Sequence, residues 1–288
     1  MEKTYNNKSI MTYILIIIGI IYIFPILLTF TNSLMSIGEI EENYSTEDGI
    51  FSDDDYKYID MNIIPETVTF NQYRHIFLNT PTYINMFWNS VKLTFPILIG
   101  QLIVSSVVAY MFTVLRFKFK EILYFLYILV MLLPLQVTMV PNYIVADMLN
   151  IKDSYLAIII PLIFNPFGVV LLRQYMKVFP YSYVEAAQMD GAGHLYIFTK
   201  LVLPMIKSGI VSLGILTFID CWNIVDQAIV FIRESHRQPL SVFLSSINQG
   251  EIGVAFASSS FYAIPILLVF FYGQKYLEDG IQTAGLKG

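Results

Sequence analysis

Residues 180–193 read PYSYVEAAQMDGAG, a short stretch with signals for the end of one helix and for both ends of the next. Pro180 stops a preceding helix, because proline has no amide hydrogen to donate. Ser182 and Glu185 have the spacing of a capping box, in which two side chains satisfy free amides at a helix start. Gly191 suits the left-handed conformation that closes a helix. We predict a short helix over 182–191 outside the bilayer, then a second helical stretch, about 194–203, that ends before Pro204.

The sequence on both sides of this stretch is typical of a membrane protein. Of the 288 residues, 56% are hydrophobic and 14% are charged, and the mean hydropathy is +0.62. Soluble domains carry about 25% charged residues, and a helix needs about 20 apolar residues to cross a bilayer. Such runs lie at about 10–31, 86–114, 122–144, 155–173, 206–226 and 254–274. We predict an all-α membrane protein with six transmembrane helices.

The same counts exclude several other classes of protein. The net charge of −5 argues against nucleic acid as a partner. The single cysteine, Cys221, allows no internal disulfide and no multi-cysteine metal site. No metal site is expected from the histidines either, since they fall in different loops: His75, His194 and His236. The chain lacks a phosphate-binding loop and any motif of an intramembrane enzyme, so we expect no catalytic residues.

The first apolar run, 10–31, has two interpretations because a basic start precedes it. A cleaved signal peptide would have a shorter apolar region, followed by a cleavage site with small residues. Neither feature is present, and we expect an uncleaved anchor.

Residues 32–84 form an acidic segment with ten of the chain's 22 acidic residues and two bases. This composition predicts a solvated, partly disordered insertion. A calcium site at Asp53–Asp55 is disfavoured, because the run lacks the spaced ligands and the glycine of a calcium loop.

The distribution of basic residues predicts the orientation. Eleven of the 17 Lys and Arg residues lie at the opposite ends of the spans from the acidic segment, and such residues concentrate on the cytoplasmic side. We expect a multi-pass protein of the bacterial plasma membrane with both termini in the cytoplasm. The expected parts are the N-terminus and first helix (1–31), an external acidic loop (32–84), a transmembrane domain of five helices with a cytoplasmic loop at 174–205 (85–275), and a cytoplasmic tail (276–288).

Polar residues inside the spans mark a candidate solute path, since they are costly in a membrane. In the fifth span Asp220, Asn223 and Asp226 recur at i, i+3 and i+6, which would place them on one helix face. Trp222 adds a ring on which a sugar could stack. The competing interpretation is an outer interface with snorkelling polar groups and a belt tryptophan.

Two spans contain residues that predict breaks or kinks. Pro134 lies in the third span, and Asn165 precedes Pro166 in the fourth, where Asn165 is a further candidate for the solute path. Such breaks suit moving elements, and packed kinks satisfied by neighbouring helices are the alternative.

The central stretch resembles a known family. Glu185-Ala186-Ala187, then Asp190-Gly191-Ala192 and Leu203-Pro204, resemble the EAA loop of ABC-importer permeases. The resemblance extends over roughly 63–288 and is strongest to the carbohydrate-uptake branch, the maltose-type inner-membrane permeases. It also rests on Asn89-Ser90, Phe167-Gly168, Leu171-Leu172-Arg173-Gln174, Trp222-Asn223 and the ending Thr283-Ala284-Gly285-Leu286-Lys287-Gly288.

The resemblance implies a type I importer fold and a mechanism. Glu185, Ala186, Ala187, Asp190 and Gly191 would belong to a coupling helix that docks in a cleft of a separate cytosolic ATPase dimer. Glu185 would serve as the capping-box acceptor, as an ion-pair partner of the ATPase, or as both. The ATPase would bind ATP and magnesium, and this chain would carry no cofactor.

The resemblance also implies partners and a substrate class. A second permease, in a heterodimer, would complete the pore, and an extracytoplasmic solute-binding protein would deliver a sugar or oligosaccharide. The alternatives are an importer for a non-sugar solute and a secondary transporter. The chain departs from the family at Lys207-Ser208, where a proline is common, and at Ile224, where many members carry an acid.

Overall fold

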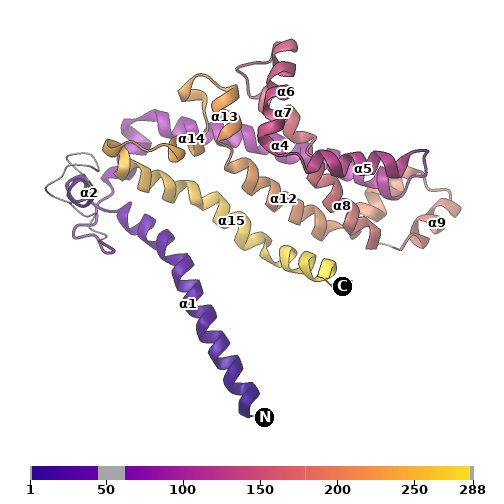
Figure 1. Cartoon of the computed structure of the whole chain (residues 1–288), viewed down its shortest axis with the longest axis horizontal. Coiled ribbons are helices and arrows are strands. Elements are labelled where there is room, and N and C mark those ends of the chain that lie inside the picture. Colours follow the sequence, from indigo (N-terminus) through magenta and orange to yellow (C-terminus); the bar gives the residue numbers. More distant parts are fainter. Residues whose placement is uncertain (1, 45–61, 179, 286–288) are drawn as a thin grey trace. The chain divides into compact units, whose positions relative to one another are not determined.

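The computed structural model describes residues 2–44, 62–178 and 180–285, and every regular element in these ranges is a helix (Figure 1). By its internal contacts the chain divides into two units. The first comprises Met1–Asn85 and Phe243–Ile264, and the second comprises Met86–Val242 and Pro265–Gly288.

The first unit begins with a long apolar helix. α1 spans Glu2–Asn32, and its most apolar stretch, within Met11–Asn32, is not buried by the rest of the described protein. A length of 22 residues is enough to cross a bilayer. The next elements are α2 (Ile37–Tyr44), α3 (Asn71–Arg74) and the π-helix η1 (His75–Asn79).

Parts of the acidic segment form helices, and a few of its apolar residues are buried. Ile40 is 5% exposed and Ile76 is 1% exposed. The ring of Phe77 packs edge-on against that of Phe261, with centroids 5.0 Å apart. Residues 62–84 are largely exposed, as expected of a solvated segment, whereas 32–44 is partly buried. The expected partial disorder and external position stay predictions. Asp53–Asp55 lies outside the described residues.

The remaining elements are also helices. α4, α14 and α15 each have residues in both units, and the others lie in the second unit or, in the case of η4, in the first. The bounds are α4 (Pro81–Thr113), α5 (Lys120–Met131), α6 (Leu135–Met148), α7 (Leu156–Ile163), α8 (Pro166–Val178), α9 (Ser182–Met189), α10 (His194–Tyr196), the π-helix η2 (Ile197–Val202), α11 (Leu203–Met205), α12 (Lys207–Trp222), α13 (Asp226–Phe231), η3 (Ser235–Arg237), α14 (Leu240–Ser245), η4 (Gln249–Glu251) and α15 (Ile252–Gly285).

The second unit has two hydrophobic clusters. The first joins α4, α5, α8, α9 and α12, and Leu172, Val184 and Leu213 are fully buried in it. The second joins α4, α7 and α13 around Ile97 and Ala228. Since α8 lies against both α5 and α12, it forms the centre of the first cluster.

The expected breaks at Pro134 and Asn165 are confirmed. α5 and α6 meet at an angle of 103°, and Pro134 takes an extended conformation between them. The single span expected over 122–144 is therefore two helices. Asn165 precedes α8, and its side-chain oxygen accepts a hydrogen bond from the Phe167 amide at 3.0 Å, which satisfies a free amide at a helix start.

The prediction that the second helical stretch ends before Pro204 is wrong. Pro204 lies inside α11, after the π-helix η2. Proline has no amide hydrogen to donate to a helix. The wider π-helical turn just before Pro204 shifts the pattern of backbone hydrogen bonds there, and the helix continues to Met205. The chain then bends by 75° into α12.

The fifth predicted span, about 206–226, is also shorter than expected. α12 ends at Trp222, and α13 begins at Asp226. The Asn223 side-chain amide donates to the Ile219 carbonyl at 2.8 Å, and such local bonds compete with the helical backbone ladder. The prediction that Asp220, Asn223 and Asp226 share one helix face is therefore wrong.

The helices supply four to six candidate membrane spans. Four are long and apolar enough by themselves: Met11–Asn32, Pro81–Thr113, Leu156–Val178 and Ile252–Tyr276. Two bent pairs, α5 with α6 and the helices of His194–Met205 with α12, bring the count to six if each pair is one span. All six overlap the apolar runs predicted from the sequence, but the helices of His194–Met205 lie within the predicted cytoplasmic loop 174–205. The count of six stays a prediction.

Candidate functional site

The start of α9 differs from the predicted capping box. The residue before the helix, Tyr181, is already in a helical conformation, and no side chain caps the helix. The Tyr181 carbonyl accepts from the amides of Val184 and Glu185, at 2.9 and 3.1 Å. The turn at Pro180 and Tyr181 therefore supplies backbone acceptors, and Ser182 lies inside the helix. The prediction of a helix here is confirmed, and the prediction that Ser182 and Glu185 form a capping box is wrong.

The end of α9 is closed as the sequence predicts. Gly191 has a φ of +83°. Its amide donates to Gln188 at 3.0 Å, and the Ala192 amide donates to Ala187 at 2.9 Å. These two bonds and the left-handed glycine form a Schellman motif, which satisfies the last carbonyls of a helix.

α9 is attached to the molecule by one side and is exposed on the other. Val184 is the only residue of the helix that is fully buried, at 0% exposure, whereas Met189 is 88% exposed. Glu185, Ala186 and Asp190 are also exposed, and Ala187 is half-buried. The exposed face combines small, charged and large apolar side chains. Met189 was not a candidate in the sequence, although its position between the two halves of the motif could have suggested it.

The segment after α9 is fixed to α4. The Tyr110 hydroxyl lies 3.1 Å from Nδ1 of His194, and the Tyr110 ring packs on that of Phe198 at 5.1 Å. α9 is therefore held between two anchored segments, α8 before it and the helix that begins at His194 after it.

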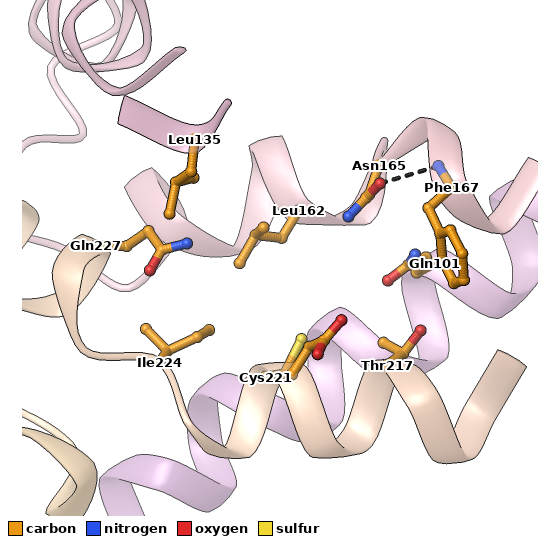
Figure 2. Close-up of a pocket in the computed structure, with 10 residues that line it drawn as sticks. Gln101, Leu135, Leu162, Asn165, Phe167, Thr217, Cys221, Ile224 and Gln227 are labelled. Atoms are coloured by element: carbon orange, nitrogen blue, oxygen red, sulfur yellow. Dashed lines mark hydrogen bonds between the residues drawn. The ribbon is translucent and has the colours of Figure 1, made fainter. Parts of the chain in front are cut away.

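A polar cavity of about 240 Å³ lies in the second unit beside the break between α7 and α8 (Figure 2). Figure 2 shows Thr217 and Cys221 of α12 facing Leu162 and Asn165 across this space, with Gln101 of α4 behind. Its lining residues are Gln101, Leu135, Leu162, Asn165, Phe167, Thr217, Asp220, Cys221, Ile224 and Gln227.

Two of the five predicted solute-path residues line this cavity, namely Asp220 and Asn165. Trp222 does not: it is 1% exposed and stacks on Phe218 with centroids 5.3 Å apart. Asn223 and Asp226 also lie outside the lining, although their neighbours Ile224 and Gln227 belong to it. The chain leaves α12 after Trp222, so Asn223 and Asp226 do not continue the helix face of Asp220.

Sequence reasoning missed three polar residues of the cavity. They are Gln101, which is 3% exposed, Thr217, which is 4% exposed, and Gln227. The Thr217 hydroxyl is buried and has no hydrogen-bond partner within the described protein. The cost of placing polar groups in a membrane singled out Asp220, Asp226, Asn165 and Asn223 in the sequence. The same rule, extended to every amide and hydroxyl within the spans, would have included Gln101 and Thr217.

The part of the chain that the structure describes contains no group of three or more His, Cys, Asp or Glu residues able to hold a metal ion.

Comparison with known proteins identifies the family. Residues 101–283 match the family described as "Binding-protein-dependent transport system inner membrane component". The arabinooligosaccharides transport system permease protein AraQ of Bacillus subtilis is 26% identical over 96% of this chain and 95% of its own length. The sn-glycerol-3-phosphate transport system permease protein UgpE of Yersinia enterocolitica is 29% identical over 77% of this chain and 76% of its own.

A solved structure has the same fold. It is the crystal structure of a bacterial ABC transporter involved in the import of the acidic polysaccharide alginate, and one of its chains is similar with a TM-score of 0.79 at 22% identity, covering 96% of this chain and 98% of that one. The sequence features, the apolar helices and the family match agree, and the chain belongs to the family of binding-protein-dependent transport system inner membrane components.

Proposed function

We propose that this chain is the membrane-spanning permease subunit of an ATP-driven importer, and that α9 is the helix that couples it to a separate ATPase. The observation that carries the proposal is the construction of α9: its exposed face is free for a partner, its end is closed by Gly191, and Val184 enters the same core as α4, α5, α8 and α12. A push on α9 would therefore reach the membrane helices without being absorbed by a flexible loop.

The partners follow from what the chain contains. No phosphate-binding loop occurs in its sequence, so ATP and magnesium would be bound by a cytosolic ATPase dimer. A second permease would complete the pore, and an extracytoplasmic solute-binding protein would deliver the solute. The orientation that suits this assembly has both termini and 174–205 in the cytoplasm, 32–84 outside, 85–275 as the transmembrane domain and 276–288 as a cytoplasmic tail.

The residues of α9 have distinct proposed roles. Ala186 is small and exposed, so a cleft of the ATPase can close on the helix, and Ala187 is half-buried against the hydrophobic cluster, where its small side chain lets α9 lie close to the rest of the unit. Glu185 and Asp190 are exposed and supply charge for pairing with the ATPase, while the large exposed side chain of Met189 supplies apolar contact area. Gly191 fixes where the helix ends.

A pair of substitutions at Gly191 tests the coupling role. A side chain here has open space around it, so the cost of replacement comes from the positive φ alone, about 1–2 kcal/mol for an ordinary residue. Gly191→Val should lower uptake of a radiolabelled arabinooligosaccharide and solute-stimulated ATP hydrolysis about fivefold or more, while membrane insertion stays normal. Gly191→Asn should retain most of both, because asparagine tolerates the left-handed region.

The matched control is Gly193→Ala. Gly193 also has open space around it, but its φ is −74°, so alanine should be neutral. Full transport by Gly191→Val would contradict the coupling role of α9, and uptake that persists without ATP hydrolysis would instead indicate a secondary transporter.

We further propose that the solute is a neutral sugar or oligosaccharide and that its path includes the cavity at Asp220. The lining has one carboxylate, three side-chain amides and a hydroxyl, and no basic residue. Amides and a carboxylate suit sugar hydroxyls, whereas an anionic solute would meet the Asp220 charge without a compensating cation. The name of the arabinooligosaccharide relative agrees with a neutral sugar. The name of the sn-glycerol-3-phosphate relative gives the competing solute class, an anion.

The charge of Asp220 is the feature to test. Asp220→Asn keeps the size of the side chain and should weaken the apparent affinity for an arabinooligosaccharide about tenfold, because a hydrogen bond to a charged group contributes about 1.5–3 kcal/mol. Asp226→Asn, outside the cavity, should leave uptake unchanged. Glycerol phosphate should not compete with the sugar for the wild-type importer, and effective competition would overturn the neutral-solute proposal.

A further inference from the structure

Arg173 is a buried charge in the middle of the second unit. It lies in α8, within the candidate span Leu156–Val178, and is 4% exposed. Arginine is almost never fully buried unless it is paired, and an ionisable residue within a membrane span marks a functional position. In the sequence it counts as one of the basic residues near a span end and as part of the stretch Leu171-Leu172-Arg173-Gln174, and neither indicates its burial.

The first contact of Arg173 is with the end of α4. Its Nε donates to the Phe112 carbonyl at 3.2 Å, and α4 ends one residue later, at Thr113. The last carbonyls of a helix have no partner within the helix, and a cation there also suits the helix dipole. Lys120 assists by donating to the carbonyls of Thr113 and Leu115, at 3.1 and 2.9 Å.

The second contact of Arg173 is with α5. The guanidinium carbon lies 3.5 Å from the centroid of the Tyr124 ring, and Tyr124 is 7% exposed. A desolvated stack of this kind is stronger than an exposed one. A nitrogen of the same guanidinium lies 3.5 Å from Glu121, a long contact to a side chain that is 76% exposed, so the ring and the carbonyl are the principal partners.

These contacts join elements that also meet α9. Phe112, Tyr124, Leu172 and Met176 belong to the cluster in which Val184 of α9 is buried. Arg173 adds polar contacts to that apolar cluster. It connects α8 to the end of α4 through the Phe112 carbonyl and to α5 through the Tyr124 ring. Resting on the proposed function, we propose that Arg173 is a positioning residue that makes α4 and α5 follow α8 when the ATPase moves α9.

The proposal predicts which features of the site matter. Arg173→Met removes the charge and leaves the Phe112 carbonyl unpaired, so nucleotide-driven movement of α8 should no longer reach α4 and α5. Gln101 of α4 and Cys221 of α12 line the same cavity, so access to Cys221 should then no longer depend on nucleotide. Tyr124→Leu removes the ring and should weaken the transmission, whereas Tyr124→Phe keeps the ring and should not, because the Tyr124 hydroxyl has no partner within the described protein. Glu121→Gln is the matched control for charge and should behave as wild type.

Cys221 provides the measurement. It is the only cysteine of the chain, it is 6% exposed, and it lines the cavity of the second unit. The importer, purified through a tag on this chain together with its ATPase, would be labelled with N-ethylmaleimide in proteoliposomes. Labelling of this chain would be followed by mass spectrometry without nucleotide and after trapping with ATP and vanadate.

In the wild-type complex we expect trapping to change the labelling rate about fivefold or more, within the range of allosteric coupling. Arg173→Met should label at one rate in both states while ATP hydrolysis per assembled complex continues. Tyr124→Leu should also reduce the effect of trapping on the labelling rate. Tyr124→Phe and Glu121→Gln should retain the effect seen in the wild-type complex.

The outcomes separate this inference from the function on which it rests. A wild-type complex without bound ATPase, or without any nucleotide effect on Cys221, would overturn the proposed function and the inference together. A wild-type response that persists undiminished in Arg173→Met or Tyr124→Leu would overturn the inference alone. A loss of assembly, hydrolysis and labelling in equal proportion in both variants would also overturn it, because it would show a role in folding only.

Discussion

Gly168 in α8 faces Ser105 in α4 with no room for a side chain between the two helices. A Cβ atom at Gly168 would lie 2.3 Å from the Ser105 hydroxyl oxygen and 3.0 Å from its Cβ. Ser105 is fully buried. Small residues permit this close approach in membrane proteins, where van der Waals contact between helices replaces the hydrophobic effect. The glycine is thus a packing requirement in the part of the second unit that holds both the cavity and Arg173.

Gly168→Ala should therefore destabilise the protein by about 1–3 kcal/mol, the usual cost of overpacking. The control is Gly214→Ala in α12, where the new Cβ would be 3.8 Å from Leu102, an ordinary contact. Because alanine favours a helix over glycine by about 1 kcal/mol, Gly214→Ala should be neutral or stabilising. Thermal unfolding of the purified chain in detergent measures both, and equal stability of the two variants would contradict the close packing.

At the same scale, the sequence predicts residues whose role depends on near neighbours and misses those whose role depends on distant ones. The left-handed conformation of Gly191 follows from its place after a helical run and is confirmed. The burial of Arg173 depends on Tyr124 and on the end of α4, some 50–60 residues away. Nothing in the local pattern of α8 distinguishes this arginine from an exposed one.

At the scale of elements, helix breaks were predictable where proline interrupts an apolar run. Pro134 separates α5 from α6, and Asn165-Pro166 separates α7 from α8, as expected. Pro204 is the exception, because the π-helix before it lets the chain continue as a helix to Met205. A π-helix depends on tertiary strain at a bend, and no spacing of residue types in the sequence indicates it.

Helix ends were less predictable than helix positions. The start of α9 uses backbone carbonyls in place of the Ser182 side chain, and α12 ends at Trp222 although apolar residues continue to Val225. In both cases a local hydrogen bond decides where the helix begins or ends: the bonds to the Tyr181 carbonyl at the start of α9 and the bond from the Asn223 side chain at the end of α12. The solute-path prediction depended on one such end. Because α12 stops at Trp222, Asp220 and Asp226 do not share one helix, and of these two only Asp220 lines the cavity.

At the scale of the whole molecule, the sequence predicts a membrane protein and the positions of its apolar runs, and the family match agrees. The number of spans depends on the two bent pairs, since their angles of 103° and 75° suit either a broken span or a re-entrant loop. The orientation is predicted only from the distribution of basic residues in the sequence. A measurement on the intact membrane is therefore needed to test it.

Cysteine mapping measures both the number of spans and the orientation. In a Cys221→Ala background, Met189→Cys, Ile64→Cys and Ile17→Cys place single thiols at residues that are 88%, 80% and 58% exposed. A membrane-impermeant maleimide should label residue 189 only from the cytoplasmic side and residue 64 only from outside, because basic residues stay inside. Residue 17 should be blocked from both sides by lipid. Labelling of 64 and 189 from the same side would contradict the proposed topology.

The π-helix at Ile197–Val202 determines in which direction α9 faces. Each residue turns an α-helix by about 100°, and a π turn takes up an extra residue within the ladder. A chain one residue shorter here could form an unbroken α-helix, but everything before it would then rotate by about 100° around the axis. The same α9 sequence would present a different face to its partner. The length of this turn is therefore a determinant of partner fit in its own right, and an insertion or deletion within it would require a matching change in the surface that α9 meets.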